Sequence, residues 1–367
     1  MTPRPPLPPV HYREYLQLER LLDCQRLESA KHGAPVHDEL LFIVVHQAYE
    51  LWFKQILWEL DAVLALFRAD SVDERDIGRA VSHLTRVKEI QKLLLAQVDV
   101  LETMTPLDFL DFRSYLVPAS GNESAQFRLI ENKLGLPPET RVRMDGMRYT
   151  DRLPHADETR IRDAEQETSL LALVDRWLAR TPFLAVGEYE FWREYRKAVD
   201  TMLADERSII ETNPEFDAAD RERRLARFEG TVRHFEALFD REKHDALVAQ
   251  GHRRFSHPAL LAALLINLYR DQPILHLPFR LLTLLMDVDE GFTNWRYRHT
   301  LMVLRMIGSK MGTGGSSGTD YLRETADKHK VFTDLFDLST FLIPRSALPA
   351  LPPEVTRTMS FQYGGEK

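Results

Sequence analysis

One stretch of the sequence restricts the fold more than any other. Residues 37–67 are apolar on nearly all sides of a helix, with scattered polar positions such as Gln47, Lys54 and Gln55. A surface helix shows a single apolar face, whereas a helix that is apolar all round is buried. Asp38 is placed to cap this helix at its start. The chain is therefore expected to build its core around one long central helix.

Helical spacing of apolar residues continues through most of the remaining chain. In the segment 76–104, Val81 and Leu84 begin one apolar face. Pro278 is expected to break or kink its helix because proline lacks the backbone N–H, and the polar stretch 141–163 is expected to be irregular or strand-like. No alternating strand pattern of useful length occurs, so the sequence predicts an all-α fold. The other predicted helices are 12–31, 106–116, 170–178, 191–211, 219–247, 256–269, 278–286, 292–307 and 321–341.

The composition indicates one soluble helical unit. Of the 367 residues, 44% are hydrophobic and 28% are charged, which suffices for a substantial core. We expect residues 1–36 to form an N-terminal arm with a short helix and residues 37–367 to form a single helical domain. Within this domain, 141–250 is expected to be a mainly surface insertion, because its long helices alternate Arg and Glu like a solvated helical pair.

Charge and cysteine content exclude several kinds of function. A net charge of -8 with interspersed basic residues leaves no footprint for a nucleic acid. The single cysteine, Cys24, excludes an internal disulfide, a multi-thiolate metal site and covalent haem attachment, which needs two cysteines. Residues 1–10 lack the apolar core of a signal peptide, and no stretch is long and apolar enough for a membrane span. We therefore expect a cytoplasmic protein.

His299 lies on the apolar face of a helix that Gly308 is placed to end. Trp295, Met302 and Val303 share that face. A histidine among such residues is usually a core residue that hydrogen-bonds to a backbone carbonyl. The alternative interpretation is an axial ligand to a haem iron. The pattern alone leaves both interpretations open.

Two further helical faces combine aromatic and polar side chains. Phe42 and His46 lie on one face of the central helix, either as core packing or as the wall of a pocket. Phe109, Arg113 and Leu116 share a face of a later helix. A guanidinium among apolar neighbours needs a carboxylate, which either the protein or a ligand can supply.

Residues 312–318 form a glycine- and serine-rich run, GTGGSSG. Its backbone can turn sharply and offer several N–H donors to an anion. It is not a Walker-type phosphate loop, because the Lys-Ser/Thr ending and the preceding strand are both missing. A flexible surface linker is the alternative interpretation.

Four segments, in the same order along the chain, resemble one known family. The resemblance is to the tryptophan 2,3-dioxygenases, which are tetrameric haem enzymes, and it covers nearly the whole chain. It is strongest in HDELLFIVVHQAYELWFKQILWELD, LETMTPLDFLDFRSYL, WRYRHTLMVLRMIGSKMGTGGSSG and KVFTDLFDLSTFLIPR. Each segment alone is a weak signal, but the four together are highly specific.

The resemblance implies a helical bundle that encloses one non-covalent haem b per subunit. The implied reaction is oxidative cleavage of the indole C2–C3 bond of L-tryptophan by O₂ at ferrous haem. Its product is N-formylkynurenine, and it is the first step of tryptophan catabolism by the kynurenine pathway. The resemblance also implies a homotetramer in which the N-terminal arms complete neighbouring sites.

Individual residues receive roles from the same resemblance. His299 matches the proximal histidine that binds the haem iron, and His46 matches the distal catalytic histidine near the indole N–H, where we expect it to position substrate. Arg113 matches the clamp for the substrate carboxylate. Tyr12 and Tyr15 match tyrosines that reach a neighbouring subunit's pocket. The full set that the resemblance implies for substrate binding is Phe42, Phe109, Arg113, Leu116, Ser120, Thr313, Tyr12 and Tyr15.

The chain departs from the family's usual sequence at two places. After the Ser-Gly at 120–121 the family usually has Phe-Gln-Ser, whereas Asn122 and Glu123 precede the serine here. After GTGGSSG the family usually has an aromatic residue, whereas Thr319 stands here. These departures motivate an alternative function, a haem-dependent monooxygenase of tryptophan or of a substituted tryptophan.

Two other classes fit the residues less well. A di-iron helical-bundle oxidase needs Glu-x-x-His pairs, and no glutamate in this chain is followed by histidine three positions later. A haem sensor without turnover would not need the set formed by Phe42, His46, Arg113 and Thr313.

Overall fold

The computed structural model describes residues 8–143, 146, 148–151, 153–182, 184–186, 189–313 and 319–360. Most of the glycine-rich run 312–318 therefore lies outside the described residues, as do the first seven residues of the arm. The helices and strands, in chain order, are α1 (Tyr12–Tyr15), α2 (Leu18–Leu22), α3 (Glu28–Lys31), α4 (His37–Arg68), α5 (Glu74–Leu101), α6 (Pro106–Arg113), η1 (Ser114–Leu116), η2 (Gly121–Glu123), α7 (Ala125–Leu134), η3 (Pro138–Thr140), α8 (His155–Gln166), α9 (Leu170–Leu178), β1 (Ala185–Val186), β2 (Tyr189–Glu190), α10 (Phe191–Thr212), α11 (Ala218–Phe239), α12 (Arg241–Ala249), α13 (His257–Leu268), α14 (Pro273–Ile307), α15 (Thr319–Lys328), α16 (Thr333–Asp337), η4 (Leu338–Phe341), η5 (Arg345–Ala347) and α17 (Pro353–Met359).

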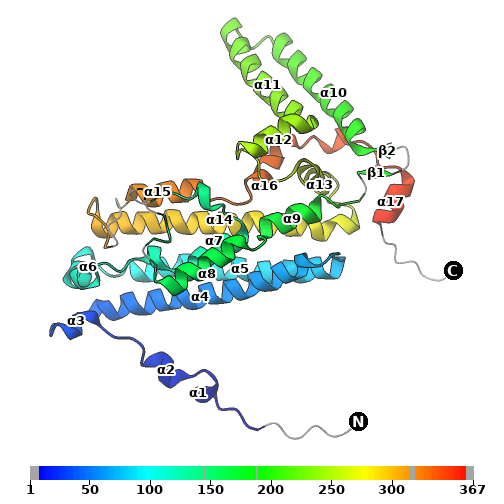
Figure 1. The fold of residues 1–367 in the computed structure, drawn as a ribbon. Coiled ribbons are helices and arrows are strands. Elements are labelled where there is room, and N and C mark those ends of the chain that lie inside the picture. The colour runs from blue at the N-terminus through cyan, green and yellow to red at the C-terminus, as the bar shows by residue number, and fades with distance from the viewer. Residues whose placement is uncertain are drawn as a thin grey trace, which may run out of the picture.

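Three long helices, α4, α5 and α14, form the core. They lie side by side, with α5 packed against both of the others (Figure 1). Leu60 of α4, Leu84 of α5 and Leu281 of α14 are fully buried between them, and each such side chain stabilises the fold by about 1.5–3 kcal/mol. The predicted central helix and the all-α fold are confirmed, since the only sheet among the described residues is the two-residue pairing of β1 with β2.

The N-terminal segment differs from its prediction. Residues 12–31, predicted as one helix, form α1, α2 and α3, with Gln17 in a left-handed conformation between the first two. No residue of α1 or α2 is buried, so no core packing stabilises a longer helix. Asp38 does not cap α4. Instead, the buried Glu39 carboxylate accepts the backbone N–H groups of Glu28 and Ser29, which ties α3 to α4.

Shorter helices cover the three-helix core. α7 and α9 pack against α4, and α15 packs against α14. α6 begins with a capping box between Thr105 and Asp108. The prediction for 141–163 was wrong where α8 forms, because Ile161 and Ala164 supply a buried helical face that packs on α7.

α14 corrects a second prediction. The sequence predicted a break or kink at Pro278 and separate helices at 278–286 and 292–307, but one continuous helix runs from Pro273 to Ile307. Pro278 lies in the second turn and removes only one backbone hydrogen bond. The fully buried leucines that follow, Leu281 and Leu285, hold the segment against the core. Gly308 ends the helix as predicted, with φ of 60° and its N–H bonded to the Leu304 carbonyl at 2.9 Å.

Two of the later helices are shorter than predicted, because aspartate carboxylates accept backbone N–H groups within the predicted ranges. Asp240 separates α11 from α12 by accepting the Lys243 N–H at 3.1 Å. Asp289 accepts the N–H groups of Val331 and Phe332, which ends the predicted helix 321–341 after α15. α10 and α11 project from the bundle (Figure 1). None of the described helices is long and apolar enough to cross a membrane.

Candidate active site

A cavity of about 280 Å³ lies among α4, α6, α7, α14 and α15. Much of its wall is apolar, with Leu101, Met104, Met302 and Met306 among the lining residues. The loop before α7 and the segment after α14 close one side. The cavity brings together seven of the residues singled out in the sequence, which are Phe42, His46, Phe109, Arg113, Ser120, His299 and Thr313.

His299 faces this cavity from α14. Its ring stacks on that of Trp295, with the two centroids 5.5 Å apart, and neither ring nitrogen is hydrogen-bonded to any residue that the structure describes. Burial, together with a smaller effect from His46, lowers the pKa of His299 to about 4. The imidazole is therefore neutral at physiological pH and offers a lone pair inside the cavity, which is what a metal ligand requires.

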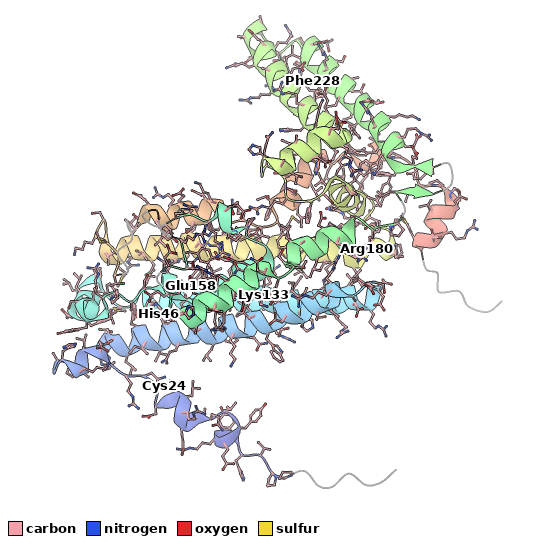
Figure 2. All side chains as sticks on the ribbon, viewed as in Figure 1. Cys24, His46, Lys133, Glu158, Arg180 and Phe228 are labelled. Atoms are coloured by element: carbon pink, nitrogen blue, oxygen red, sulfur yellow. The ribbon has the colours of Figure 1, made fainter. Side chains whose placement is uncertain are left out.

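His46 lies on α4, inside the bundle (Figure 2). Its Nδ1 is 2.7 Å from the Phe42 carbonyl oxygen. A carbonyl can only accept, so Nδ1 carries the proton and Nε2 keeps its lone pair. Burial lowers the pKa of His46, although the Phe42 carbonyl and the charge of Glu50 partly raise it. The Phe42 ring lies 4.1 Å from the His46 ring and 5.7 Å from that of Phe109, centroid to centroid.

Arg113 ends α6 at the edge of the cavity. Its Nη2 donates to the Met311 carbonyl, and its buried Nε has no hydrogen-bond partner among the described residues. Thr313 donates through Oγ1 to the Ala119 carbonyl at 2.7 Å. The segment after α14 is thus folded over the loop that carries Ser120. A buried donor without an acceptor indicates that this wall is built for a polar ligand.

A cluster of charged residues, unrecognised in the sequence, lines another part of the cavity. Glu131 of α7 is only 3% exposed. One of its oxygens accepts from Arg296 at 2.8 Å and His329 at 3.2 Å, and the other accepts from Arg141 at 3.0 Å and Arg128 at 3.2 Å. Three guanidinium groups contact this one carboxylate, while Asp289 acts on Arg296 and Glu165 acts on Arg141 from farther away. Buried charge of this kind calls for an anionic ligand.

A partial signal for this cluster was present in the sequence. Arg128 and Glu131 stand three positions apart in a helix whose other face is apolar, so they lie next to each other. Arg296 precedes His299 by three positions and shares its side of α14. The partners themselves, His329 and Arg141, come from distant segments, and no local pattern brings them to Glu131.

The residues around the cavity fit a haem b group. His299 offers an unprotonated nitrogen to an iron, and the apolar side chains of Met302 and Met306 suit a macrocycle. Haem b carries two carboxylates, which suit a cavity wall where Arg128 and Arg296 both contact the single carboxylate of Glu131. Arg128 also keeps a buried Nε without a partner among the described residues.

Some residues singled out in the sequence lie elsewhere. Leu116 is partly buried against the core but does not line the cavity. Tyr12 and Tyr15 on α1 are each 74% exposed, and α1 lies apart from the bundle (Figure 1). Of the two departures in the loop, Asn122 lines the cavity and Glu123 does not. The third departure, Thr319, begins α15 outside the lining.

Comparisons with known proteins agree on one family. The sequence model of the tryptophan 2,3-dioxygenases matches residues 8–342. The chain is similar to the tryptophan 2,3-dioxygenase of Bdellovibrio bacteriovorus, at 49% identity over 97% of this chain and 99% of that protein. It is also 49% identical to the enzyme of that name from Xenopus laevis, over 97% of this chain and 87% of the relative. The Dictyostelium discoideum enzyme is 46% identical, over 96% and 89%.

Proposed function

The chain belongs to the tryptophan 2,3-dioxygenase family, and from this membership we propose how its own residues take part in the reaction. The protein is a haem-dependent oxidoreductase that cleaves L-tryptophan oxidatively with O₂, and its cofactor is haem b. Bound haem supplies the iron at which O₂ is activated. The alternative monooxygenase function is disfavoured, because relatives named as dioxygenases match nearly the full length of the chain.

We propose that His299 binds the haem iron and that Arg128 and Arg296 hold the two haem carboxylates. The free, unprotonated nitrogen of His299 supports the first assignment. The contacts of both guanidinium groups with the single carboxylate of Glu131 support the second. His299 and Arg296 lie on α14, and Arg128 lies on α7. Together they would hold the haem at its iron and at its carboxylates.

For the substrate, we propose that Arg113 binds the carboxylate of tryptophan while Ser120 and Thr313 provide hydroxyl groups nearby. A guanidinium binds a carboxylate through two parallel hydrogen bonds, which fixes orientation as well as position. This role is supported by the Nε of Arg113, which has no hydrogen-bond partner among the described residues. Tryptophan would have to replace the present contact from Arg113 to the Met311 carbonyl.

At the indole end, we propose that His46 positions the ring by accepting its N–H at Nε2. The proton on Nδ1 is committed to the Phe42 carbonyl, which leaves Nε2 as an acceptor. Indole N–H is a very weak acid, so a neutral histidine is a poor match for removing that proton. Phe42 and Phe109, which stack on each other, supply an aromatic wall beside it.

We further propose a homotetramer in which Tyr12 and Tyr15 reach the site of a neighbouring subunit. The exposure of Leu22 on the arm, and of Trp58 and Leu51 on α4, supports association, since large apolar side chains of this kind gain stability when another subunit covers them. The free, exposed thiol of Cys24 is consistent with the reducing cytoplasm.

We also propose that residues 37–367 form one catalytic domain, with 141–250 as an insertion in it. The core helices α4, α5 and α14 come from both sides of that segment and pack together.

Product mass tests the reaction. The haem-loaded, reduced protein is given L-tryptophan and isotopically labelled O₂, and the product is analysed by mass spectrometry. We expect two labelled oxygen atoms in one ring-opened molecule. A product with a single labelled atom would instead indicate the monooxygenase, and Asn122 and Glu123 would be the first residues to replace.

A further inference from the structure

His329 contacts two members of the charged cluster, and the proposed reaction gives this residue no role. It directly follows α15, where its backbone N–H bonds to the Thr325 carbonyl at 3.0 Å. The side chain is only 2% exposed. Its ring contacts Glu131 through Nδ1, and its own carbonyl accepts from Nη1 of Arg296 at 3.0 Å. One residue therefore contacts both a carboxylate and a guanidinium of the charged cluster.

The second ring nitrogen fixes the protonation state. Nε2 of His329 accepts the backbone N–H of Val142 at 3.1 Å. A backbone N–H can only donate, so Nε2 must keep its lone pair and the single proton of the neutral ring lies on Nδ1. That proton is donated to Glu131. The neutral ring thus bridges the chain after η3 to the cluster, and a doubly protonated ring would lose Val142.

We propose that His329 is a positioning residue for the two carboxylates of the cofactor, acting through Glu131, Arg128 and Arg296. The proposal rests on the proposed function, because it takes these carboxylates to be those of haem b. With its ring on Glu131 and its carbonyl on Arg296, His329 holds this ion pair in one arrangement. Glu131 in turn orients Arg128, whose buried Nε has no acceptor in the part of the chain that the structure describes.

The charges around His329 agree with a neutral ring. The charged groups packed around it are Glu131 and Arg128 from α7, Arg296 and Asp289 from α14, and Arg141, which pairs with Glu131. Burial lowers the pKa of His329 most, and Arg296 and Arg128 lower it further, whereas the hydrogen bond and charge of Glu131 raise it. A proton on Nε2 would also add a positive charge beside the guanidinium groups of Arg128 and Arg296.

The rate of haem loss tests the positioning role. Haem-loaded wild type, His329→Gln and His329→Leu are mixed with excess apomyoglobin at pH 7.5, and transfer of haem b is followed by absorbance. Glutamine can accept from Val142 and donate to Glu131, so we expect its rate to match wild type. Leucine loses both contacts, of which the one to Glu131 leads to the cofactor, and we expect release about five times faster, as for one hydrogen bond of about 1 kcal/mol.

Haem b dimethyl ester, whose carboxylates are blocked, provides the control. If His329 acts through the carboxylates, wild type and His329→Leu should release the ester at the same rate. The same acceleration with the ester would overturn the proposal in favour of general loosening of the fold. Equal rates with haem b itself would also overturn it. Failure of the wild-type protein to retain haem b at all would count against the proposed function instead.

A pH profile tests the neutral ring. Because folding lowers the pKa of His329, its unfavourable effect is absent above about pH 6.5, the unfolded value, and grows as the pH falls from there toward the folded pKa. Glutamine cannot titrate. We therefore expect the urea midpoint of haem-loaded His329→Gln to rise relative to that of wild type as the pH is lowered from 7.5 to 5. A constant difference across this range would rule out the neutral bridge.

Discussion

At the scale of single residues, hydrogen-bond partners give the three cavity histidines three different states. His46 has one nitrogen committed to a backbone carbonyl, and His329 has both nitrogens committed. His299 has neither committed among the described residues. Their sequence surroundings do not distinguish them, because the partners that decide the state of His329 lie on other segments. The open nitrogens of His46 and His299 are the ones that a ligand can use.

Replacing His299 tests the iron ligand. We expect His299→Ala to abolish stable haem binding, because the substitution removes the one described residue that we assign as a ligand of the iron. His46→Ala is the matched control and should retain haem, since His46 is assigned to the substrate. Soret absorbance per subunit after purification with added haem measures both. Full haem occupancy in His299→Ala would refute the assignment.

Replacing Arg113 tests the carboxylate clamp. Arg113→Ala should retain haem and weaken tryptophan binding by about 1.5–3 kcal/mol, or roughly 10- to 150-fold in Kd, because hydrogen bonds to a charged group are lost. Arg113→Lys keeps the charge but not the planar fork, so its Kd should lie between the two. Titration of the haem spectrum with tryptophan gives the values. A Kd for Arg113→Ala equal to that of wild type would remove Arg113 from the site.

At the scale of elements, ion pairs join α5 to α14 near the cavity. Arg298 of α14 donates to both oxygens of Glu102, at 2.5 and 2.7 Å, and to Asp99 at 2.8 Å. Glu102 directly follows α5 and is only 10% exposed. The hydrogen bond and charge of Arg298 hold the pKa of Glu102 below its usual value, against the opposing effect of burial. These contacts fasten the end of α5 to the helix that carries His299.

Replacing Glu102 should weaken that connection in a pH-dependent way. A carboxylate with a lowered folded pKa contributes stability that is complete above its unfolded pKa, about 4.5, and is lost as the pH falls through the folded value. We expect Glu102→Gln to lower the free energy of unfolding at pH 7 by about 1–2 kcal/mol. Urea unfolding from pH 7 to 3 measures this. The difference from wild type should shrink below pH 4.5, and a constant difference would contradict the role of charge.

At the scale of the whole molecule, packing within one chain does not account for the position of the N-terminal arm. α1 and α2 have no buried residue, and they extend away from the bundle (Figure 1). The hydrogen bonds from the backbone of Glu28 and Ser29 to the Glu39 carboxylate fix where the arm leaves the core. An arm that is anchored at its base and exposes Tyr12, Tyr15 and Leu22 is suited to pack on another subunit.

Mixed oligomers test whether the arms act between subunits. A variant with Tyr12→Ala and Tyr15→Ala has an intact cavity, and Arg113→Ala has an intact arm. If the arm serves a neighbour, each variant alone should turn over tryptophan poorly, and co-expression should restore part of the activity. Light scattering should show the same oligomer in each preparation. Activity of the tyrosine variant equal to that of wild type would disprove the role of the arm.

The sequence predicted the long helices and singled out seven residues that line the cavity. Phe42, His46 and His299 were recognised because helical spacing places them on apolar faces, which must be buried. Helix ends were less predictable. Pro278 did not end its helix, since buried leucines beyond it outweigh one lost hydrogen bond. Asp289 ended another helix from a distance, through contacts with Val331 and Phe332 that no local pattern shows.

The sequence by itself determined the all-α class, the central helix and the family, because these depend on periodicity and on residue order. Only the tertiary structure decided which polar groups share the cavity. Glu131 meets Arg296 and His329 across separations of 165 and 198 residues, and no helical period reaches that far. A buried charge in a low dielectric costs free energy unless it is paired, so these charged groups require partners. That requirement is the physical reason for proposing that the carboxylates of the cofactor lie beside this cluster.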